Sequence, residues 1–490
     1  MLLRIKKHPI IDFKDCEKIS FYFNNTKMYG FKGDSIASAL HAAGIKKLTK
    51  SLKYNSPRGF FCGIGKCSSC LMKVNKVPNV RTCIAPLKNG IHVETQEKLA
   101  DWPDVEFNSK SRVTINVDVL VVGAGPAGLY ASLEAAGQGA SILLVDENQV
   151  VGGQLVKQTH KFFGSKQEKA GTRGIKIAID LEKDLRKFEK NGKIMSMMNS
   201  TVVGYYEGDK ENQHKFAVIK REGYENNLYE VNCRAAIFAC GAMENMLLFP
   251  GNDLPGVYGA GAVQTLMNVF GVKPGKKVIM VGAGNVGLIV SYQLLQAGIE
   301  VNRVVEAMPQ IGGYHVHAAK LRRCKVPILT SHSIKEVYGN GKVEGAVIVK
   351  LDNNWLPLKG SEEKIDCDTI CLAVGLTPST RFLYQVGAEM EFIPEAGGYV
   401  AIHDNSMHTT IKGIYVAGDS SGIEEASTAM IEGKIAGISA AMSLGYKKKG
   451  DSSLKNQHIF ELDRLRAGPF GEKARIGKYK ISKLLEKRYA

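Results

Sequence analysis

Two copies of one glycine-rich fingerprint constrain the fold of this chain more than any other feature of its 490 residues. The first copy has glycines at 123, 125 and 128, after an apolar run and before a segment rich in Ala and Leu. In this motif the first glycine permits a tight turn, the second lets the backbone approach a pyrophosphate, and the third lets a helix pack on a strand. Gly123, Gly125 and Gly128 therefore predict a strand–turn–helix unit with a pyrophosphate at the N-terminus of the helix.

Residues downstream of the first fingerprint supply the other groups that a dinucleotide site needs. The next apolar run ends at Asp146, about 20 residues further on, where a carboxylate binds the ribose 2′-hydroxyl. Glu147 is an alternative for the same contact. A double-glycine turn follows, and we expect Gly153 to lie at the cofactor and Gln154 to offer a hydrogen bond to a flavin.

The second copy of the fingerprint has glycines at Gly282, Gly284 and Gly287, and its following strand ends at Glu306. The Glu306 carboxylate would repel a 2′-phosphate, and no arginine follows it. We therefore predict that this site prefers NAD(H), or another adenosine ligand with a free 2′-hydroxyl, over NADP(H). A copy of the fold that binds nothing is the alternative.

Two histidines, His315 and His317, follow the second double-glycine turn. We interpret them as polar loop residues near a ligand rather than as catalytic groups.

The segment from 409 to 419 resembles the second FAD motif of flavoproteins with two dinucleotide-binding domains. It reads as a buried strand that delivers Gly418 and Asp419 to its carboxyl end, before a helix from about residue 425. In that superfamily the aspartate binds the ribityl chain and the pyrophosphate. The segment that ends at Gly241 resembles one of the strand-to-loop crossovers of the same superfamily. The predicted fold is therefore α/β and Rossmann-like, with one nucleotide domain inserted in the other.

Four cysteines, Cys62, Cys67, Cys70 and Cys83, have the spacing C-x4-C-x2-C-x12-C. Three ligands in one small-residue loop are typical of a plant-type [2Fe–2S] cluster, whose four thiolates surround two irons. A structural zinc site is the alternative, although zinc more often uses paired knuckles. The order of these residues resembles the β-grasp ferredoxin-like domains that are fused to dehydrogenases. Cys16 lies outside the pattern and reads as structural.

Positive charge is concentrated at both ends of the chain, which carries a net charge of +17. Residues 1–100 hold 18 Lys and Arg against 6 Asp and Glu, and residues 447–490 hold 13 against 5. We interpret both ends as docking surfaces for an acidic partner or electron acceptor, with a merely solvated surface as the alternative.

The predicted segments are a ferredoxin-like domain at 1–100, a linker at 101–115, the FAD-type domain at 108–245 and 376–446, the second nucleotide domain at 246–375, and a basic tail at 447–490.

Several classes of protein are excluded by what the sequence lacks. The sequence contains no run of 18 apolar residues, which is the length that a membrane-spanning helix needs, and no signal-peptide pattern follows Met1. We therefore expect a cytoplasmic protein without a transmembrane segment. The basic ends contain no recognisable nucleic-acid module, so we expect no nucleic-acid partner. Outside the cluster segment, no C-x2-C or C-x4-C pair offers a redox disulfide beside a flavin. No general base for an organic substrate stands out, so the catalytic residues are unknown and substrate oxidation is expected elsewhere.

Together these motifs resemble the large (alpha) subunit of hetero-oligomeric, FAD-dependent amino acid and amine dehydrogenases, over nearly the whole chain. That group includes dye-linked L-proline dehydrogenase, sarcosine oxidase, opine oxidase and hydrogen cyanide synthase. The resemblance implies FAD, a second adenine nucleotide (NAD or ATP), and FMN at a subunit interface. It also implies a FAD-containing beta subunit of D-amino-acid-oxidase type, an electron acceptor, and one more small iron–sulfur subunit that supplies any second cluster.

The predicted function is that of an electron-transfer subunit in an oxidoreductase acting on CH–NH donors of the proline, hydroxyproline, sarcosine or opine class. Electrons would pass from the partner flavin subunit through flavin and [2Fe–2S] to the acceptor. The end of the chain at Ala490 favours the shorter proline dehydrogenase or opine oxidase arrangement. The alternative is a self-sufficient NAD(H)-dependent reductase of the ferredoxin or quinone type, which uses the same motifs and needs no partner.

Overall fold

The computed structural model describes residues 2–13, 17–98, 113–162, 169–208, 214–222 and 225–489. Most of the predicted linker, and Cys16, lie outside these residues. The chain divides into two compact units, each containing two segments of sequence. Unit 1 consists of residues 1–106 and 244–375, and unit 2 consists of residues 107–243 and 376–490. No helix in the described part of the chain is both long enough and apolar enough to cross a membrane.

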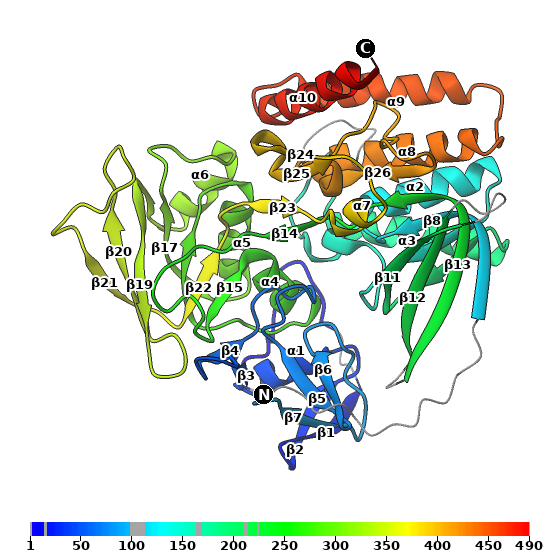
Figure 1. The fold of residues 1–490 in the computed structure, drawn as a ribbon. Coiled ribbons are helices and arrows are strands. Elements are labelled where there is room, and N and C mark those ends of the chain that lie inside the picture. The colour runs from blue at the N-terminus through cyan, green and yellow to red at the C-terminus, as the bar shows by residue number, and fades with distance from the viewer. Residues whose placement is uncertain are drawn as a thin grey trace. The chain divides into compact units, whose positions relative to one another are not determined.

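Unit 2 is built on a seven-stranded sheet in the order β10-β9-β8-β13-β12-β11, with β26 beside β13 (Figure 1). Strands β8, β9, β10 and β26 run parallel to the carboxyl-terminal part of β13, whereas β12 pairs antiparallel with both β13 and β11. The central strands are buried at successive positions, as expected for parallel strands that are covered on both faces. The strands are β8 (Val113–Val122), β9 (Ile142–Val145), β10 (Ile194–Met197), β11 (Ser200–Glu207), β12 (His214–Glu222), β13 (Glu225–Phe238) and β26 (Ile414–Val416).

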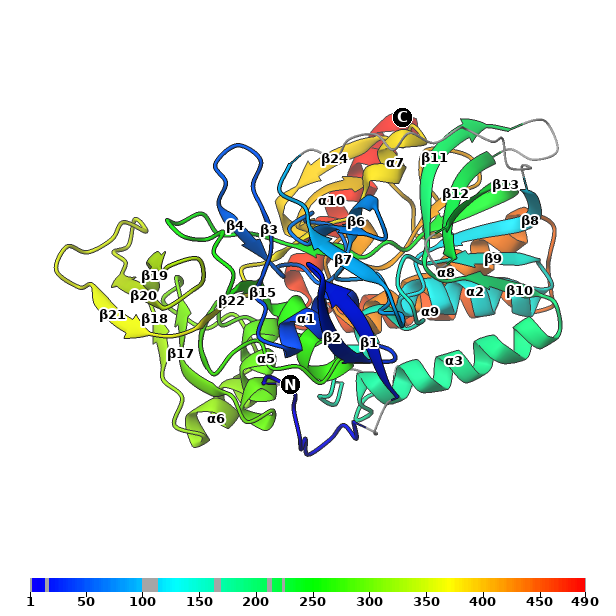
Figure 2. The same cartoon turned by 90° about the horizontal axis from the view of Figure 1, so that it is seen from below.

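Three helices pack on one face of this sheet: α2 (Pro126–Gln138), α3 (Gly174–Lys190) and α8 (Ala426–Ser443) (Figure 2). Helices α2 and α8 approach each other through glycines. A Cβ atom on Gly433 would lie 2.2 Å from the Ala127 carbonyl oxygen, and one on Gly437 would lie 2.4 Å from that of Ala131. Only glycine at these two positions allows the helix that follows Asp419 to lie so close to the helix of the first fingerprint.

The remainder of unit 2 contains short elements and the two C-terminal helices. The predicted basic tail is largely helical, and Leu462 and Ile481 from its two helices lie in hydrophobic cores of the unit. The elements are η1 (Gly153–Lys157), α7 (Arg381–Gln385), β24 (Met390–Ile393), η3 (Pro394–Ala396), β25 (Gly398–Ala401), η4 (Gly418–Ser421), α9 (Asp451–Arg466) and α10 (Glu472–Tyr489). Strands β14 (Ala242–Glu244) and β23 (Leu376–Pro378) lie where the chain passes between units.

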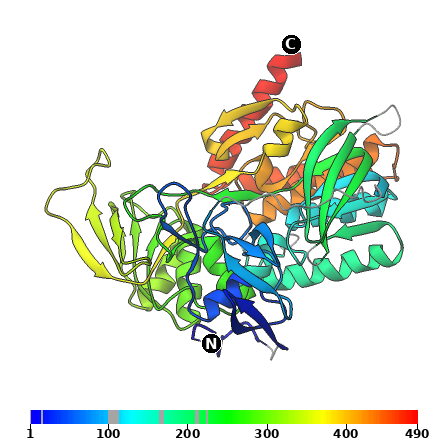
Figure 3. The same cartoon turned by 60° about the horizontal axis from the view of Figure 1, so that its bottom comes forward.

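The N-terminal part of unit 1 is a mixed sheet in the order β2-β1-β7-β5-β6, drawn in blue in Figure 3, with helix α1 beside it. Helix α1 (Ile36–Ala42) begins with a capping box in which Ser35 and Ser38 exchange side-chain hydrogen bonds with backbone amides. The strands of this sheet are β1 (Lys18–Phe23), β2 (Thr26–Phe31), β5 (Leu71–Val74), β6 (Val77–Arg81) and β7 (His92–Thr95), and β3 (Lys47–Lys50) and β4 (Pro57–Gly59) form a separate two-stranded sheet.

The second part of unit 1 contains a parallel sheet in the order β15-β22-β16-β17-β18 and a three-stranded antiparallel sheet, β19-β20-β21. One hydrophobic core joins it to the N-terminal part, since Phe60 clusters with Tyr258 and Leu266. The chain near Leu3 also pairs with the segment at 271–273, where the Lys273 amide donates to the Leu3 carbonyl at 2.7 Å.

The elements of this second part of unit 1 are β15 (Val257–Gly259), α4 (Ala260–Gln264), η2 (Thr265–Val269), β16 (Lys277–Val281), α5 (Asn285–Gln296), β17 (Glu300–Glu306), α6 (His315–Arg323), β18 (Ile328–Thr330), β19 (His332–Tyr338), β20 (Gly345–Lys350), β21 (Glu363–Asp366) and β22 (Thr369–Leu372).

The strand expected from 409 to 417 is much shorter in the structure. Only Ile414–Val416 form β26, because the preceding residues make a turn. The turn is closed by the amide and the hydroxyl of Thr409, which both donate to the Ile414 carbonyl at 2.9 Å. The strand still delivers Gly418 and Asp419 to its carboxyl end.

Candidate functional site

Backbone hydrogen bonds bring the carboxyl ends of the parallel strands in unit 2 to one edge of the sheet. The Gly123 amide donates to Val145, the Ala239 amide to Val122 and the Ala417 amide to Phe238, at 2.8 to 3.0 Å. The loops after β8, β9, β13 and β26 therefore lie side by side at this edge. In open α/β sheets such an edge is where ligands bind.

The three glycines of the first fingerprint meet three different steric demands. Gly123 has φ of +106°, and a Cβ there would lie 2.2 Å from the Ala239 carbonyl oxygen. A Cβ on Gly128 would lie 1.7 Å from the Gly123 carbonyl oxygen, so this position permits the helix to pack on the strand. A Cβ on Gly125 would meet nothing within 4 Å. Packing within the protein therefore does not require glycine at position 125. The close approach of a pyrophosphate to the backbone would require it.

The start of α2 has the free polar groups that an anion needs. Its N-cap, Gly125, supplies no side-chain hydrogen bond, so the first amides of the helix lack a side-chain partner. Asp146 accepts a hydrogen bond from the Ala124 amide at 2.6 Å through one oxygen, and from Asn148 at 2.7 Å through the other. Burial raises the pKa of Asp146. Glu147 is partly buried next to it. These contacts place the Asp146 carboxylate beside the fingerprint turn.

The second fingerprint repeats this geometry in unit 1. Gly282 has φ of +102°, and a Cβ there would lie 2.3 Å from the Ala373 carbonyl oxygen. A Cβ on Gly287 would lie 2.0 Å from the Gly282 carbonyl oxygen, and one on Gly284 would meet nothing within 4 Å. Glu306 accepts from the Ala283 amide at 2.6 Å, as Asp146 does from Ala124. The second copy therefore keeps the steric demands of the three glycines and the hydrogen bond from the turn to the acidic residue.

The double-glycine turns lie over both fingerprints. The Gly152 amide donates to the Ala124 carbonyl, and a Cβ on Gly153 would lie 2.7 Å from the Gly125 Cα. The Gln154 side chain that follows is exposed. In the second copy His315 is exposed, whereas His317 is buried and burial lowers its pKa. Both histidines lie in the first turn of α6, so their interpretation as loop residues is wrong, and their distance from a ligand stays a prediction.

The loop that carries Asp419 completes the edge of the sheet in unit 2. Its 3₁₀ turn, Gly418–Ser421, is linked to the crossover at Gly241, whose carbonyl accepts from Ser420 Oγ at 3.2 Å. Burial is the main cause that raises the pKa of Asp419 to about 7, and the Glu432 and Glu424 carboxylates add to it. Gly241, Gly418 and Asp419, predicted from separate stretches of sequence, thus lie in adjoining loops.

One loop of unit 1 holds three of the four clustered cysteines, and Cys83 follows β6. Three residues of the loop have left-handed backbone: Gly63 with φ of +63°, Gly65 with +73° and Ser68 with +61°. The loop also packs on helix α4, because the Gly259 amide donates to the Phe61 carbonyl at 3.1 Å and a Cβ on Gly63 would lie 3.2 Å from the Ala262 Cα. The cluster loop is therefore held by both segments of unit 1.

The four thiols are neighbours in the order Cys67, Cys62, Cys83 and Cys70. Cys62 is within side-chain hydrogen-bonding range of Cys67 and Cys83, and Cys70 is within range of Cys83. Hydrogen bonds from Cys67 and Cys83 lower the pKa of the Cys62 thiol. Cys62, Cys70 and Cys83 are buried, and Cys67 is partly exposed. Among the described residues no three His, Cys, Asp or Glu side chains are arranged around one metal ion. Four neighbouring thiols suit a two-iron cluster, in which each iron has two thiolate ligands.

The other cysteines of the described residues are free thiols. Burial raises the pKa of Cys233, Cys367 and Cys371, which makes these thiols poor nucleophiles. Cys324 is exposed and directly follows α6 as its C-cap residue. Within the part of the chain that the structure describes, no disulfide is available as a redox centre.

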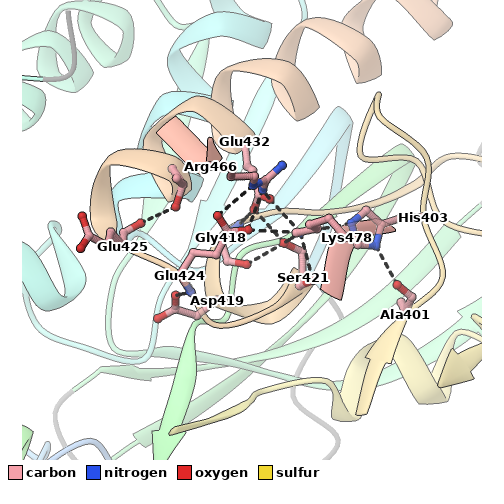
Figure 4. Close-up of polar contacts among 11 residues, drawn as sticks. Ala401, His403, Gly418, Asp419, Ser421, Glu424, Glu425, Glu432, Arg466 and Lys478 are labelled. Atoms are coloured by element: carbon pink, nitrogen blue, oxygen red, sulfur yellow. Dashed lines mark hydrogen bonds and ion pairs between the residues drawn. The ribbon is translucent and has the colours of Figure 1, made fainter. Parts of the chain in front are cut away.

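The sequence interpretation missed a group of buried charges behind the Asp419 loop. Glu432 of α8 is 2% exposed and contacts Arg466 of α9 and Lys478 of α10 at 2.7 and 2.8 Å (Figure 4). Two cations of the basic tail are thus turned inward, which corrects its interpretation as a docking surface at these positions. The available signal was Glu432 itself, a carboxylate within an apolar helix, which requires a buried counter-charge.

Comparison with known proteins places this site in a family. The family model described as pyridine nucleotide-disulphide oxidoreductase matches residues 117–433, which include both fingerprints and the Asp419 loop. The chain belongs to this family. A second model, described as a 2Fe-2S iron-sulfur cluster binding domain, matches residues 16–98. This match includes all four clustered cysteines and supports the [2Fe–2S] prediction over the zinc alternative.

Similar proteins carry the names that the sequence resemblance predicted. The chain is 25% identical to the alpha subunit of sarcosine oxidase from Rhizobium meliloti (strain 1021), over 90% of this chain and 47% of that protein. It is 26% identical to an opine oxidase subunit of Rhizobium meliloti, over 69% and 65%. The chain therefore spans about half and about two thirds of these two relatives. The crystal structure of L-proline dehydrogenase from P. horikoshii matches with a TM-score of 0.68 and 24% identity, over 94% of this chain and 79% of that one.

These findings confirm the predicted fold class and the predicted family resemblance. The chain has the fold of a flavin-type oxidoreductase with an N-terminal 2Fe–2S domain. The matched family model is one of oxidoreductases. The roles of individual site residues remain predictions.

Proposed function

We propose that this chain is the electron-transfer subunit of a multisubunit, flavin-dependent dehydrogenase that acts on the CH–NH bond of an amino acid or amine. The substrate class is that of proline, hydroxyproline, sarcosine or opines. A partner subunit of D-amino-acid-oxidase type oxidises the substrate, and electrons pass through this chain to an acceptor. The observation that carries the proposal is the combination, in one chain, of a four-thiol cluster loop and a two-nucleotide body without a redox disulfide among its described residues.

The residues at the edge of the unit 2 sheet fit FAD. The open space at Gly125 admits a pyrophosphate, and the amides at the start of α2 face it. Asp146 or Glu147 binds the adenosine ribose, Asp419 binds the ribityl chain, and Gly153, Gln154 and Gly241 lie in the loops beside them. When bound, a flavin accepts two electrons together and releases them singly, and an iron–sulfur cluster carries one electron. Cys62, Cys67, Cys70 and Cys83 hold that cluster.

The residues of the second fingerprint fit a second adenine nucleotide, NAD or ATP. Gly284 leaves open space for the phosphates, as Gly125 does, and Glu306 lies at the ribose position. FMN at the interface with the partner subunit, a small iron–sulfur subunit, and a cytoplasmic location belong to the same proposal.

Co-purification tests the proposed function directly. The chain is produced together with a candidate partner of D-amino-acid-oxidase type, and dye reduction is measured with proline, hydroxyproline, sarcosine and opines. We expect a stable complex that reduces the dye with one of these substrates, whereas this chain alone does not. Dye reduction by the partner at the same rate without this chain would contradict the proposal.

The intact second fingerprint favours one alternative, a self-sufficient NADH-dependent reductase. In that case NADH would reduce the flavin of the isolated chain rapidly, which stopped-flow absorbance at the flavin band would show. Slow reduction by NADH, together with rapid reduction in the presence of the partner and its substrate, would favour the electron-transfer subunit.

FAD affinity is expected to depend on pH through Asp419. The pKa of this carboxyl is about 7 without ligand, and hydroxyl groups that donate to it favour the charged form. Affinity should therefore be constant well above pH 7 and fall below pH 7, by at most about tenfold per pH unit. Titration of the flavin-free chain with FAD between pH 5.5 and 8.5, followed by flavin fluorescence, measures this slope.

The variant Asp419→Asn should bind FAD more weakly and lose the slope, because an amide does not titrate. The exposed Asp463 on α9 provides a matched control, since Asp463→Asn makes the same chemical change away from the site. An unchanged slope in Asp419→Asn would contradict the role of Asp419.

Discrimination between NADH and NADPH is expected to depend on Glu306. Its carboxylate lies beside the Ala283 amide of the second turn, where it would repel a 2′-phosphate. The wild-type chain should bind NADH more tightly, and Glu306→Gln should reduce the preference by about tenfold. Calorimetric titration with both nucleotides measures the ratio. Glu300→Gln, at the exposed start of the same strand, should leave it unchanged.

A further inference from the structure

The buried carboxylate of Glu432 holds the turn that carries Asp419. Glu432 accepts hydrogen bonds through Oε2 from the Gly418 amide at 2.8 Å and from Ser421 Oγ at 2.7 Å. These two residues are the first and last of the 3₁₀ turn. Because one oxygen binds both ends, Glu432 determines where Asp419, between them, is placed (Figure 4).

The counter-charges of Glu432 come from the two C-terminal helices. Arg466 donates to Glu432 Oε1 at 2.7 Å and binds Glu424 with two hydrogen bonds, at 2.6 and 2.9 Å. Lys478 lies 2.8 Å from Glu432 Oε1 and donates to the carbonyl and hydroxyl oxygens of Ser421 at 3.0 and 2.7 Å. Lys478 therefore contacts the Asp419 turn directly as well as its support.

When Asp419 is ionised, the charges in this group do not cancel. Glu424, Glu432 and Asp419 face two cations, Arg466 and Lys478. His403 adds no charge, because burial and Lys478 lower its pKa to about 3, and its Nδ1 donates to the Ala401 carbonyl at 2.7 Å. The Lys478 ammonium also lies 3.3 Å from His403 Nε2 (Figure 4). The positive charge of Lys478 lowers the pKa of Asp419, against the effect of burial and of the two glutamates.

Stability alone is a weak reason for such a group. Replacing a buried ion pair by apolar side chains is often neutral or stabilising, so a buried network is better explained by what its geometry specifies. Here the geometry joins α9 and α10 to the turn that carries the predicted flavin ligand. Other lysines of α10 make ordinary surface pairs, as Lys480 does with Glu395 at 2.7 Å.

We propose that Arg466 and Lys478 are positioning residues for the flavin, through which the C-terminal helix pair fixes the Gly418–Ser421 turn and the charge beside Asp419. The inference rests on the proposed function, in that FAD binds this chain at the Asp419 turn. It assigns a role to the C-terminal helices that differs from docking of a partner.

The test compares Lys478→Met with Lys480→Met in the full chain. Both changes remove one ion-paired lysine from α10, but only Lys478 contacts the turn. In Lys478→Met we expect FAD to dissociate at least about tenfold more readily. We also expect the pH at which affinity begins to fall to move upward, because one cation beside Asp419 is lost while the carboxylates remain. Lys480→Met should match the wild type in both measurements, and Lys478→Arg should recover part of the affinity.

A second measurement does not depend on flavin. Hydrogen exchange in the flavin-free chain should be faster at the amides of residues 418–424 in Lys478→Met and unchanged in Lys480→Met. If Lys478→Met does not fold, as judged by circular dichroism, Ser421→Ala keeps both charges and should still speed exchange and weaken FAD binding.

Three outcomes are distinguishable. If the wild-type chain binds FAD and Lys478→Met equals Lys480→Met in affinity, pH profile and exchange, the inference is wrong and the proposed function stands. If the wild-type chain does not bind FAD, the proposed flavin site is wrong and the inference fails with it. If Lys478→Met lowers only the melting temperature and leaves affinity, pH profile and exchange unchanged, the role of Lys478 is structural and the inference is overturned.

Discussion

Replacement of Cys70 by serine is expected to abolish the iron–sulfur centre of this chain. Cys70 is 2% exposed, and its carbonyl accepts a hydrogen bond from Thr82 Oγ1 at 2.6 Å, next to Cys83. Its thiol therefore cannot be replaced by a neighbouring group without a rearrangement of the loop. The expected result is loss of nearly all iron and acid-labile sulfide, and of the visible absorption that reductant bleaches, with flavin binding retained.

Cys324→Ser is the matched control for this experiment. Cys324 belongs to the same unit but is exposed at the end of α6, far along the chain from the cluster loop. Iron, sulfide and the spectrum should stay at wild-type levels in this variant. A wild-type preparation that contains zinc but no iron or sulfide would contradict the cluster assignment, as would Cys70→Ser with full iron and sulfide content.

Gly125→Val is expected to weaken FAD binding on the order of 100-fold, because the new side chain occupies the space of the pyrophosphate and removes two or more charge-assisted hydrogen bonds. The backbone at Gly125 has φ of −75° and ψ of −174°, which any residue adopts, and a Cβ meets no atom within 4 Å. The flavin-free variant should therefore fold normally. Equilibrium dialysis against FAD and a thermal melt of the flavin-free chain measure the two quantities.

Two further variants show whether the effect is specific to the site. Gly137→Val lies on the same helix, also in open space, and should leave FAD binding unchanged. Gly284→Val makes the same change in the second fingerprint and should abolish binding of the second nucleotide while flavin is retained. If Gly125→Val bound FAD like the wild type, the pyrophosphate would not lie on this turn.

Much of the candidate site could be predicted from the sequence because its demands are local. Each fingerprint needs glycine where the backbone turns with positive φ or where two backbones touch, and the structure shows both reasons at Gly123 and Gly128. The placement of Asp146 and Glu306 beside their turns follows from the order of parallel strands, since each acid ends the strand next to the fingerprint strand. Cluster ligands are equally local, because three of four lie within nine residues of one loop, from Cys62 to Cys70.

Prediction of secondary structure was least accurate where side chains compete with the backbone pattern. The apolar run before Gly418 reads as one long strand, yet Thr409 closes a turn and leaves only Ile414–Val416 in the sheet. Similarly, the basic composition of the C-terminal segment predicts an exposed surface, whereas Arg466 and Lys478 are bound to Glu432. Composition averages over the faces of a helix and cannot show which cation is turned inward.

The sequence by itself therefore determined the family of the fold, the two nucleotide fingerprints and the four thiols of the cluster loop. These depend on short spacings whose steric reasons hold in any chain. Only the tertiary structure decided that the ferredoxin-like segment shares a hydrophobic core with the residues from 244 to 375. It also decided that helices α9 and α10 reach back to the turn at Asp419. Both results rest on contacts between residues far apart in the chain. Such contacts depend on how whole helices and sheets pack, so no periodic or local pattern in the sequence predicts them.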